Sequence, residues 1–214
     1  MMQTLQTIGV LGGTFDPIHV GHLRLAIECQ TQLKLDAIHL IPSHQPVHRP
    51  RAIATAEERL AMLKAAVKDT NLVVDPREIQ QQKPMYTIDT LMQLREEMPE
   101  RSLSLLIGMD GLLSFDTWHR YTEILHYAHI VVAYRPPYAL PAEGSLAGWF
   151  KQHLEPNHAC IHQQKAGGLF LLPIPLLEIS ASEIRKQFAI GGNPRYLLPE
   201  AVYQYIQSHG IYTS

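Results

Sequence analysis

Short apolar runs alternate along the chain with longer stretches whose apolar residues recur at helical spacing. The runs are continuous and do not alternate in polarity, which is typical of strands that are buried on both faces of a sheet. We predict strands over Thr7–Leu11, Ala37–Ile41, Asn71–Val74, Leu103–Ile107, His129–Tyr134 and Leu169–Ile174. This alternation of strands and helices predicts an α/β protein with a parallel sheet and helices on both of its faces.

Three helices are marked by apolar periodicity and by their end residues. We predict them over Thr55–Asp69, Thr87–Met98 and Pro199–His209. Thr55 and Glu58 have the spacing of a capping box, and Gly210 suits the end of the last helix. The fold class therefore includes a helical portion at the C-terminus. The whole of 1–214 is predicted to be a single domain.

Composition and charge narrow the class of protein. The chain has 214 residues, of which 46% are hydrophobic and 18% charged, so disorder is disfavoured. Its net charge of -2 weighs against a nucleic-acid binder, which usually carries a basic surplus. No apolar run reaches the length of a membrane span or a signal peptide, and Cys29 and Cys160 form no disulfide framework. We expect a cytoplasmic protein without membrane or nucleic-acid partners. Whether it forms a homo-oligomer is left open.

A glycine-rich segment directly follows the first predicted strand and opens the first helix. It reads GGTFDPIHVGH, from Gly12 to His22. Glycines let a phosphate approach the backbone closely, and a helix N-terminus supplies free N–H groups for an anion. His19 and His22 are three residues apart, so they share one face of a helix. The alternative is a plain strand–helix turn with two surface histidines. A positive charge on them would oppose the helix dipole unless an anion were bound there.

This segment resembles the (H/T)xGH signature of the nucleotidyltransferase superfamily, whose members adenylate or cytidylate a phosphate-bearing acceptor and release pyrophosphate. A second segment, ISASEIR, follows the last predicted strand. Ser180 and Glu183 could form an ordinary helix cap, whereas Ser182 and Arg185 could together hold a polyphosphate. The segment resembles the ISxTxIR-type motif of the same superfamily, with Ser182 in place of the usual Thr.

The middle and the end of the chain resemble the bacterial nicotinate-nucleotide adenylyltransferases. The resemblance rests on Pro46-Val47-His48-Arg49, Tyr86-Thr87, Gly108-Met109-Asp110, Thr117-Trp118, Arg135-Pro136 and the ending LLPEAVYQYIQSHGIY. It implies a Rossmann-like, doubly wound fold and transfer of the adenylyl group of ATP to nicotinate mononucleotide, as part of NAD biosynthesis. It also implies a magnesium ion carried mainly by the ATP phosphates. Val47, Met109 and His119 depart from the family's commoner residues.

Several of these residues also have a physical interpretation. Trp118 offers a flat face to a cationic pyridinium, or it could be a core tryptophan. Thr87 at a predicted helix N-cap could hold a carboxylate, or it could simply cap the helix. His48 and Arg49 could meet an acceptor phosphate or be solvated loop charges. Asp110 is implied by resemblance to contact the adenosine, and otherwise it would cap a short helix.

The candidate site is therefore as follows. The catalytic residues are predicted to be His19, His22 and Arg185. ATP is predicted to be bound by Gly12, Gly13, Thr14, Phe15, His19, His22, Gly108, Asp110, Ser180, Ser182 and Arg185. Nicotinate mononucleotide is predicted to be bound by Thr14, His48, Tyr86, Thr87, Trp118 and Arg135. We expect no metal ligands among the side chains, because the spacing of His153, His158, Cys160 and His162 matches no strong zinc signature.

Two other functions are considered. Pantetheine-phosphate adenylyltransferases resemble the chain less, since that family usually has Thr where His19 stands and lacks the Thr117-Trp118 element. A catalytically silent nucleotide-binding module is disfavoured by the presence of His19, His22, Ser182 and Arg185. Pyrophosphate release with each candidate acceptor would separate the three.

Overall fold

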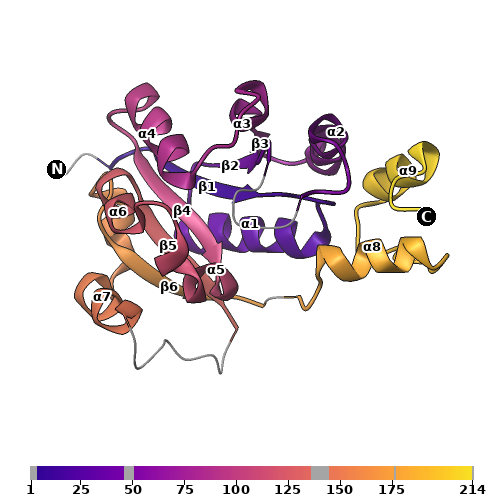
Figure 1. The fold of residues 1–214 in the computed structure, drawn as a ribbon. Helices are drawn as coiled ribbons and strands as arrows, with labels where there is room; N and C mark the ends of the chain where they lie inside the picture. Colours follow the sequence, from indigo (N-terminus) through magenta and orange to yellow (C-terminus); the bar gives the residue numbers. More distant parts are fainter. Residues whose placement is uncertain (1–3, 46–50, 136–144, 176, 214) are drawn as a thin grey trace. The chain divides into compact units, whose positions relative to one another are not determined.

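The structure is a computed structural model that describes residues 4–45, 51–135, 145–175 and 177–213. Its strands form one six-stranded sheet (Figure 1). They are β1 (Thr7–Gly13), β2 (Ala37–Pro42), β3 (Leu72–Val74), β4 (Ser102–Gly108), β5 (His129–Tyr134) and β6 (Leu169–Pro173). All six predicted strands are confirmed, with bounds shifted by no more than two residues at either end.

The order of the strands is β3-β2-β1-β4-β5-β6. Parallel pairing is seen between β1 and β4, between β4 and β5, and between β5 and β6, with Val10 opposite Leu105 in the first pair. The sheet grows outward in one direction from β1 and in the other from β4. This reversal is the switch point of a doubly wound α/β sheet. The predicted Rossmann-like α/β class is therefore confirmed.

The α-helices of the described residues lie between these strands in the chain, except α8 and α9, which follow β6. They are α1 (Val20–Leu33), α2 (Ala56–Val67), α3 (Arg77–Gln80), α4 (Thr87–Glu97), α5 (Met109–Leu113), α6 (Ile124–Tyr127), α7 (Ser145–His153), α8 (Ala181–Ala189) and α9 (Glu200–His209). The capping box at the start of α2 is confirmed, since Thr55 accepts from Glu58 N–H and Glu58 accepts from Thr55 N–H. Gly210 ends α9 with a positive φ of 62°. Among the described residues, no helix combines the length and the apolarity needed to cross a bilayer.

The chain divides into two compact units of internal contacts. The first comprises the described residues of 1–11, 27–39 and 86–175. It is built on β4, β5 and β6, whose side chains are almost all buried, and α4 packs against α6. The single domain predicted over 1–214 stays a prediction.

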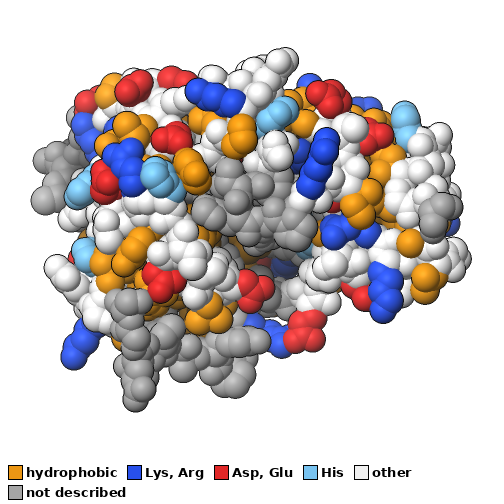
Figure 2. Space-filling view, viewed as in Figure 1, with side chains coloured by type: hydrophobic (Ala, Val, Ile, Leu, Met, Phe, Trp, Pro, Cys, Tyr) orange, Lys and Arg blue, Asp and Glu red, His pale blue; other side chains and the backbone are white. Residues whose placement is uncertain are grey.

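The second unit comprises the described residues of 12–26, 40–85 and 176–214. Here α2 packs against α9, and the ring of Phe188 in α8 lies near the rings of both Tyr203 and Tyr212. On the face of the whole molecule that Figure 2 shows, acidic and basic side chains are interspersed over the described residues. This mixture agrees with the small net charge.

Candidate functional site

The glycine-rich segment is a loop between the end of β1 and the start of α1. A Cβ at Gly21 would lie 3.0 Å from Nδ1 of His19, which is tighter than an ordinary contact, so a larger residue there would press on this ring. Gly12 has nothing within 4 Å of the position where its Cβ would be. Ser43 N–H donates to the carbonyl of Gly13 at 2.9 Å and fixes that end of the loop. The loop thus has a defined shape with an uncrowded backbone at Gly12.

His19 and His22 are brought together as the spacing predicted. Their rings are stacked, with centroids 3.6 Å apart, and Phe15 meets His22 edge-on at 5.1 Å. His19 immediately precedes α1, and its backbone N–H donates to Nδ1 of His22 at 3.3 Å. A neutral His22 must therefore carry its proton on Nε2, which makes that nitrogen a hydrogen-bond donor.

The His19 ring is only 5% exposed. Burial lowers its pKa to about 4, because the imidazolium would lose its hydration, so the ring is neutral at pH 7. Its Nδ1 is buried, and the described residues offer it no hydrogen-bond partner. Buried polar atoms without a partner are uncommon in folded proteins and often mark functional positions.

The loop is held from α2 by a buried guanidinium. Arg59 is 1% exposed and donates to the carbonyls of Thr14 at 2.7 Å, Ser43 at 2.7 Å and His44 at 2.8 Å. Arg59 is not among the residues predicted for the site. The available signal was a charged side chain on the apolar face of a predicted helix, next to Met62 and Leu63.

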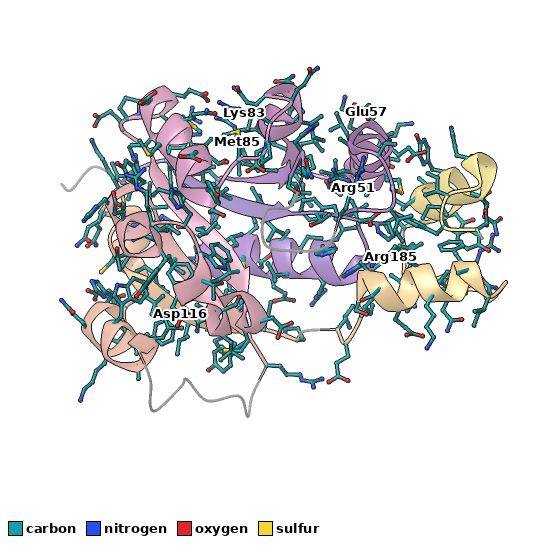
Figure 3. All side chains as sticks on the ribbon, in the orientation of Figure 1. Arg51, Glu57, Lys83, Met85, Asp116 and Arg185 are labelled. Carbon is teal, nitrogen blue, oxygen red and sulfur yellow. The ribbon has the colours of Figure 1, made fainter. Side chains whose placement is uncertain are left out.

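The second motif forms the start of α8. Ser180 is the N-cap and accepts from Glu183 N–H at 3.2 Å, while Ser182 lies in the first turn. Arg185 projects from this helix (Figure 3), and its Nη1 donates to the carbonyl of Asp16 at 2.6 Å. The two predicted motifs are therefore in contact through Asp16 and Arg185. We call the set Gly12–Phe15, His19, His22, Ser180, Ser182 and Arg185 the loop cluster.

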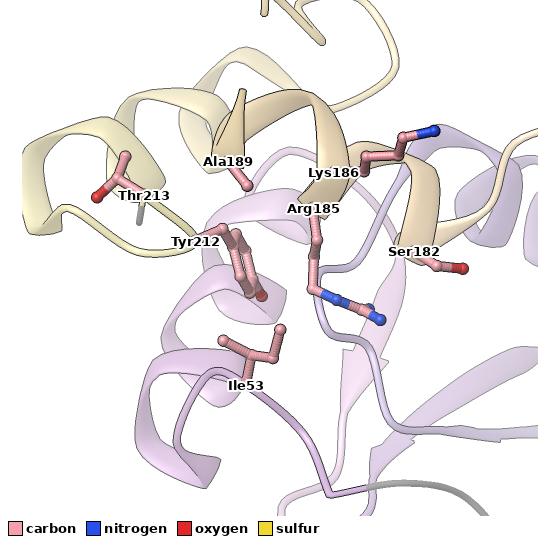
Figure 4. A pocket seen from close by; sticks show the side chains of 7 residues that line it. All are labelled: Ile53, Ser182, Arg185, Lys186, Ala189, Tyr212 and Thr213. Atoms are coloured by element: carbon pink, nitrogen blue, oxygen red, sulfur yellow. The ribbon is translucent and has the colours of Figure 1, made fainter. Parts of the chain in front are cut away.

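A cavity of about 450 Å³ adjoins the loop cluster (Figure 4). It is lined by Ile53, Ser182, Arg185, Lys186, Ala189, Tyr212 and Thr213. In this view Arg185 extends from α8 toward the middle of the cavity, whereas Lys186 points away from it. An arginine beside a helix N-terminus provides two features that favour an anion.

The acceptor residues predicted in the first unit lie at the start of α4 and after α5. The interpretation of Thr87 as the N-cap is wrong by one residue: Tyr86 is the N-cap and Thr87 begins the helix. Asp89 explains the shift, because its carboxylate accepts from Tyr86 N–H at 3.3 Å. The Tyr86 ring lies 4.3 Å from the ring of His119. Thr87 still lies in the first turn of α4, where N–H groups lack partners within the helix.

Trp118 follows a short turn of 3-10 helix over Phe115–Thr117. It is half-buried, with its ring 5.2 Å from that of Phe115, and a Cβ at Gly111 would lie 3.7 Å from it. Neither a fully buried core tryptophan nor a free surface side chain is therefore seen. We call the set Tyr86, Thr87, Trp118 and His119 the ring cluster.

The remaining predicted residues differ in what the structure says of them. Gly108 ends β4 and is the N-cap of α5, so the interpretation of Asp110 as that cap is wrong. Asp110 is instead an exposed residue of the first turn of α5. Arg135 directly follows β5 and is half-buried. His48 and Arg49 lie outside the described residues.

The histidines near α7 contact backbone carbonyls. The rings of His153, His158 and His162 lie within hydrogen-bond distance of the carbonyls of Trp149, Leu171 and Leu33. Across the described ranges, no group of three or more His, Cys, Asp or Glu side chains could hold a metal ion.

Comparison with known proteins places this arrangement in a family. The family model described as cytidylyltransferase-like matches residues 10–187, which include both motifs. A protein of Aeromonas salmonicida named probable nicotinate-nucleotide adenylyltransferase is 45% identical over 206 residues, covering 96% of each chain. A protein of Cellvibrio japonicus with the same name is 40% identical, over 96% of this chain and 98% of its own. The chain belongs to the nicotinate-nucleotide adenylyltransferase family.

A solved structure confirms the fold of this adenylyltransferase family for the chain. The nicotinic acid mononucleotide adenylyltransferase of Plasmodium falciparum, complexed with APC, matches with a TM-score of 0.73 over 97% of both chains. The same enzyme has been solved complexed with NaAD. Sequence identity to these structures is only 16–17%, so they support the fold alone.

Two further residues of this family member were missed from the sequence. Asp16 lies within the quoted first motif, and Tyr212 lies within the quoted C-terminal segment, but neither was given a role. In the structure the Tyr212 hydroxyl donates to the carboxylate of Asp16 at 2.7 Å. Their pairing across 196 positions leaves no local signal in the sequence.

Proposed function

We propose that the chain transfers the adenylyl group of ATP to nicotinate mononucleotide, giving nicotinate adenine dinucleotide and pyrophosphate, as a step of NAD biosynthesis. The observation that carries the proposal is the stacked pair of His19 and His22 in a loop whose backbone is uncrowded at Gly12. The chain is also 45% identical, over 96% of its length, to a relative that bears this activity in its name.

We assign the ATP phosphates to the loop cluster. The backbone at Gly12 and Gly13 and the side chains of His19, His22 and Thr14 would approach the α-phosphate. Ser180, Ser182 and Arg185 would hold the β and γ side, with the start of α8 adding favourable potential. Phe15 shapes the loop by packing edge-on against His22. Gly108 and Asp110 are assigned to the adenosine.

The nicotinate ring is assigned to the ring cluster. Trp118 would stack on the cationic pyridinium, and Thr87, with the first-turn N–H groups of α4, would hold the carboxylate. Tyr86 supports this position through its contact with His119. His48 and Arg135 are assigned to the acceptor phosphate, with Thr14 of the loop cluster.

The reaction needs no general base, because a phosphate monoester is already a nucleophile at pH 7. An oxygen of the acceptor's 5′-phosphate would form a bond to the α-phosphorus while the bond to the β-phosphate oxygen breaks and pyrophosphate leaves. Catalysis would then come from positioning and from donors aimed at the developing charge. Nε2–H of His22 and the Arg185 guanidinium are such donors.

The nucleotide substrate is expected to be the magnesium complex of ATP. Magnesium retains several waters and is often bound largely through substrate phosphates. The nearby Asp16 carboxylate already accepts three hydrogen bonds from the protein, which fits an ion carried by the nucleotide better than one held by this side chain.

The test is pyrophosphate release from MgATP with each of three acceptors: nicotinate mononucleotide, nicotinamide mononucleotide and phosphopantetheine. We expect turnover to be fastest with nicotinate mononucleotide. Faster turnover with phosphopantetheine would reassign the substrate. Absence of turnover with all three, in protein that still binds ATP, would leave a nucleotide-binding module.

The course of the transfer has its own test. Direct displacement forms no adenylated enzyme and inverts configuration at the α-phosphorus, whereas a covalent intermediate would give overall retention. ATP made chiral at that phosphorus distinguishes the two, and retention would contradict the proposal.

A further inference from the structure

Asp16 is a buried carboxyl side chain in the middle of the glycine-rich loop. Its side chain is held by three donors: Ile53 N–H at 2.9 Å, Ala54 N–H at 3.1 Å and the hydroxyl of Tyr212 at 2.7 Å. The residue is only 5% exposed. Because its oxygens are occupied by the protein, the Asp16 carboxylate acts as a fixed anchor.

Arg185 depends on this anchor for its orientation. Its Nη1 donates to the backbone carbonyl of Asp16 at 2.6 Å and lies 3.7 Å from Oδ2 of the same residue. A guanidinium is planar and rigid, so holding one nitrogen against Asp16 restricts the directions in which the other nitrogens can donate. The position of Asp16 therefore restrains the orientation that Arg185 can present to a phosphate.

Tyr212 holds Asp16 from the segment after α9. Burial raises the pKa of its hydroxyl, and so does its hydrogen bond to the Asp16 carboxylate, so the hydroxyl remains a proton donor. The backbone of Tyr212 has a φ of 67°, a left-handed conformation that costs free energy in a residue with a side chain. Such a conformation persists where surrounding contacts impose it.

We infer that Asp16 and Tyr212 are positioning residues for ATP: the Tyr212 hydroxyl fixes Asp16, and Asp16 orients Arg185 toward the β and γ phosphates. The inference rests on the proposed function for the role of Arg185. It assigns a role in substrate binding to a segment outside both motifs. Neither Asp16 nor Tyr212 is required to touch the nucleotide.

The chain offers a matched control for Tyr212. Tyr203 is another buried tyrosine beside Phe188, with exposed fractions of 6% for Tyr203 and 7% for Tyr212. The Tyr203 hydroxyl accepts a hydrogen bond from Gln207 at 2.7 Å. Tyr203→Phe and Tyr212→Phe therefore each remove one bonded hydroxyl next to the same ring.

The experiment measures the Kd for a non-hydrolysable ATP analogue by calorimetry, and the KM for ATP and for the acceptor, in both variants. We expect Tyr212→Phe to weaken ATP binding by roughly tenfold while the acceptor KM changes less than about twofold. Tyr203→Phe should leave both constants near their wild-type values. Equal effects of the two variants would overturn the inference.

A double-mutant cycle separates positioning from general loosening. In an Arg185→Ala background, Tyr212→Phe should weaken analogue binding by less than about twofold further, because the guanidinium that it positions is gone. An undiminished tenfold effect in that background would overturn the inference. Should Tyr212→Phe fail to fold, Asp16→Asn takes its place in the cycle with the same expectation.

Failure of the proposed function would be visible separately. A wild-type protein that binds the analogue but transfers no adenylyl group would refute the activity. The binding cycle would still decide whether Asp16 and Tyr212 position Arg185.

Discussion

The loop cluster and the ring cluster are built in different ways. The loop cluster is held by buried residues that contact its members: Arg59 donates to three carbonyls, and Asp16 accepts from three donors. In the ring cluster, His119 is exposed, and Trp118 is half-buried and directly follows a turn of three residues. Stabilising a developing charge requires donors fixed in advance, whereas stacking on a flat ring tolerates some adjustment. We interpret the difference as one between catalysis and recognition.

The largest expected effect is loss of a donor from the loop cluster. His22→Ala should lower kcat by about 10²-fold or more, as for removal of a preorganised charge stabiliser. Thermal stability should change little, because His22 is only partly buried. The measurement is steady-state turnover alongside a melting curve.

His209→Ala is the control for that variant, because His209 is an exposed histidine on α9. It should retain wild-type turnover. Near-normal turnover in a folded His22→Ala protein would contradict the catalytic role of the loop cluster.

Acid should destabilise the loop cluster through His19. Its folded pKa of about 4 lies below the unfolded value of about 6.5, so the unfolded chain binds more protons between these values. Stability is then lost as pH falls from about 6.5 to about 4, by up to about 3 kcal/mol from this residue. Urea unfolding of wild type and His19→Gln, measured between pH 4 and pH 7, would check this contribution.

The expected outcome is a weaker pH dependence of the unfolding free energy in His19→Gln. His209→Gln, which changes an exposed ring, should follow the wild type. Parallel curves for all three proteins would show that the His19 ring can be protonated in the folded state at little cost.

Discrimination between acceptors should come from the ring cluster. A site of donors satisfies both oxygens of a carboxylate but leaves the NH₂ of a carboxamide facing donors, at a cost of about 1–3 kcal/mol plus a lost charge-assisted bond. We expect nicotinate mononucleotide to be preferred over its amide by at least about 10²-fold in kcat/KM. Competition at matched MgATP would measure this ratio.

Thr87→Val, which removes the hydroxyl while keeping the shape, should narrow that preference. The ratio is the readout, because a general loss of activity leaves it unchanged. Equal use of acid and amide by the wild type would contradict the assignment of the carboxylate to α4.

The smallest effect is expected from removing the ring of Trp118. Trp118→Ala should raise the KM of both acceptors by about tenfold alike, because stacking contacts the ring and not its substituent. Trp149→Ala is the matched control, since Trp149 also contacts Phe115, at 5.5 Å, and has no assigned ligand. If the two variants had the same effect, Trp118 would act only through packing.

Local patterns in the sequence predicted the strands, the principal helices and the meeting of His19 with His22. Each of these depends on neighbours within about one helical turn or one strand, where periodicity and caps carry the signal. The N-cap of α4 is one residue earlier than predicted, at Tyr86, whose N–H donates to Asp89. Helix ends are decided by single bonds of this kind.

The hydrogen bonds by which Arg59 and Tyr212 hold the glycine-rich loop could not be predicted in the same way. Arg59 reaches Thr14 across 45 positions, and Tyr212 reaches Asp16 across 196. No periodicity links such residues, and a charged side chain on a helix is usually expected to be solvated. The contacts of these residues can be recognised only in the three-dimensional structure.

The different sequence separations of these two contacts also predict the order in which they form during folding. The entropy lost in closing a flexible segment grows with the logarithm of its length, so closing 196 positions costs about 1.3 kcal/mol more than closing 45. During refolding, Arg59 of α2 should therefore form its hydrogen bonds to the glycine-rich loop before Tyr212 reaches Asp16. A chain in that intermediate condition would have native secondary structure but an unaligned Arg185, and recovery of nucleotide binding would lag behind recovery of the helix signal.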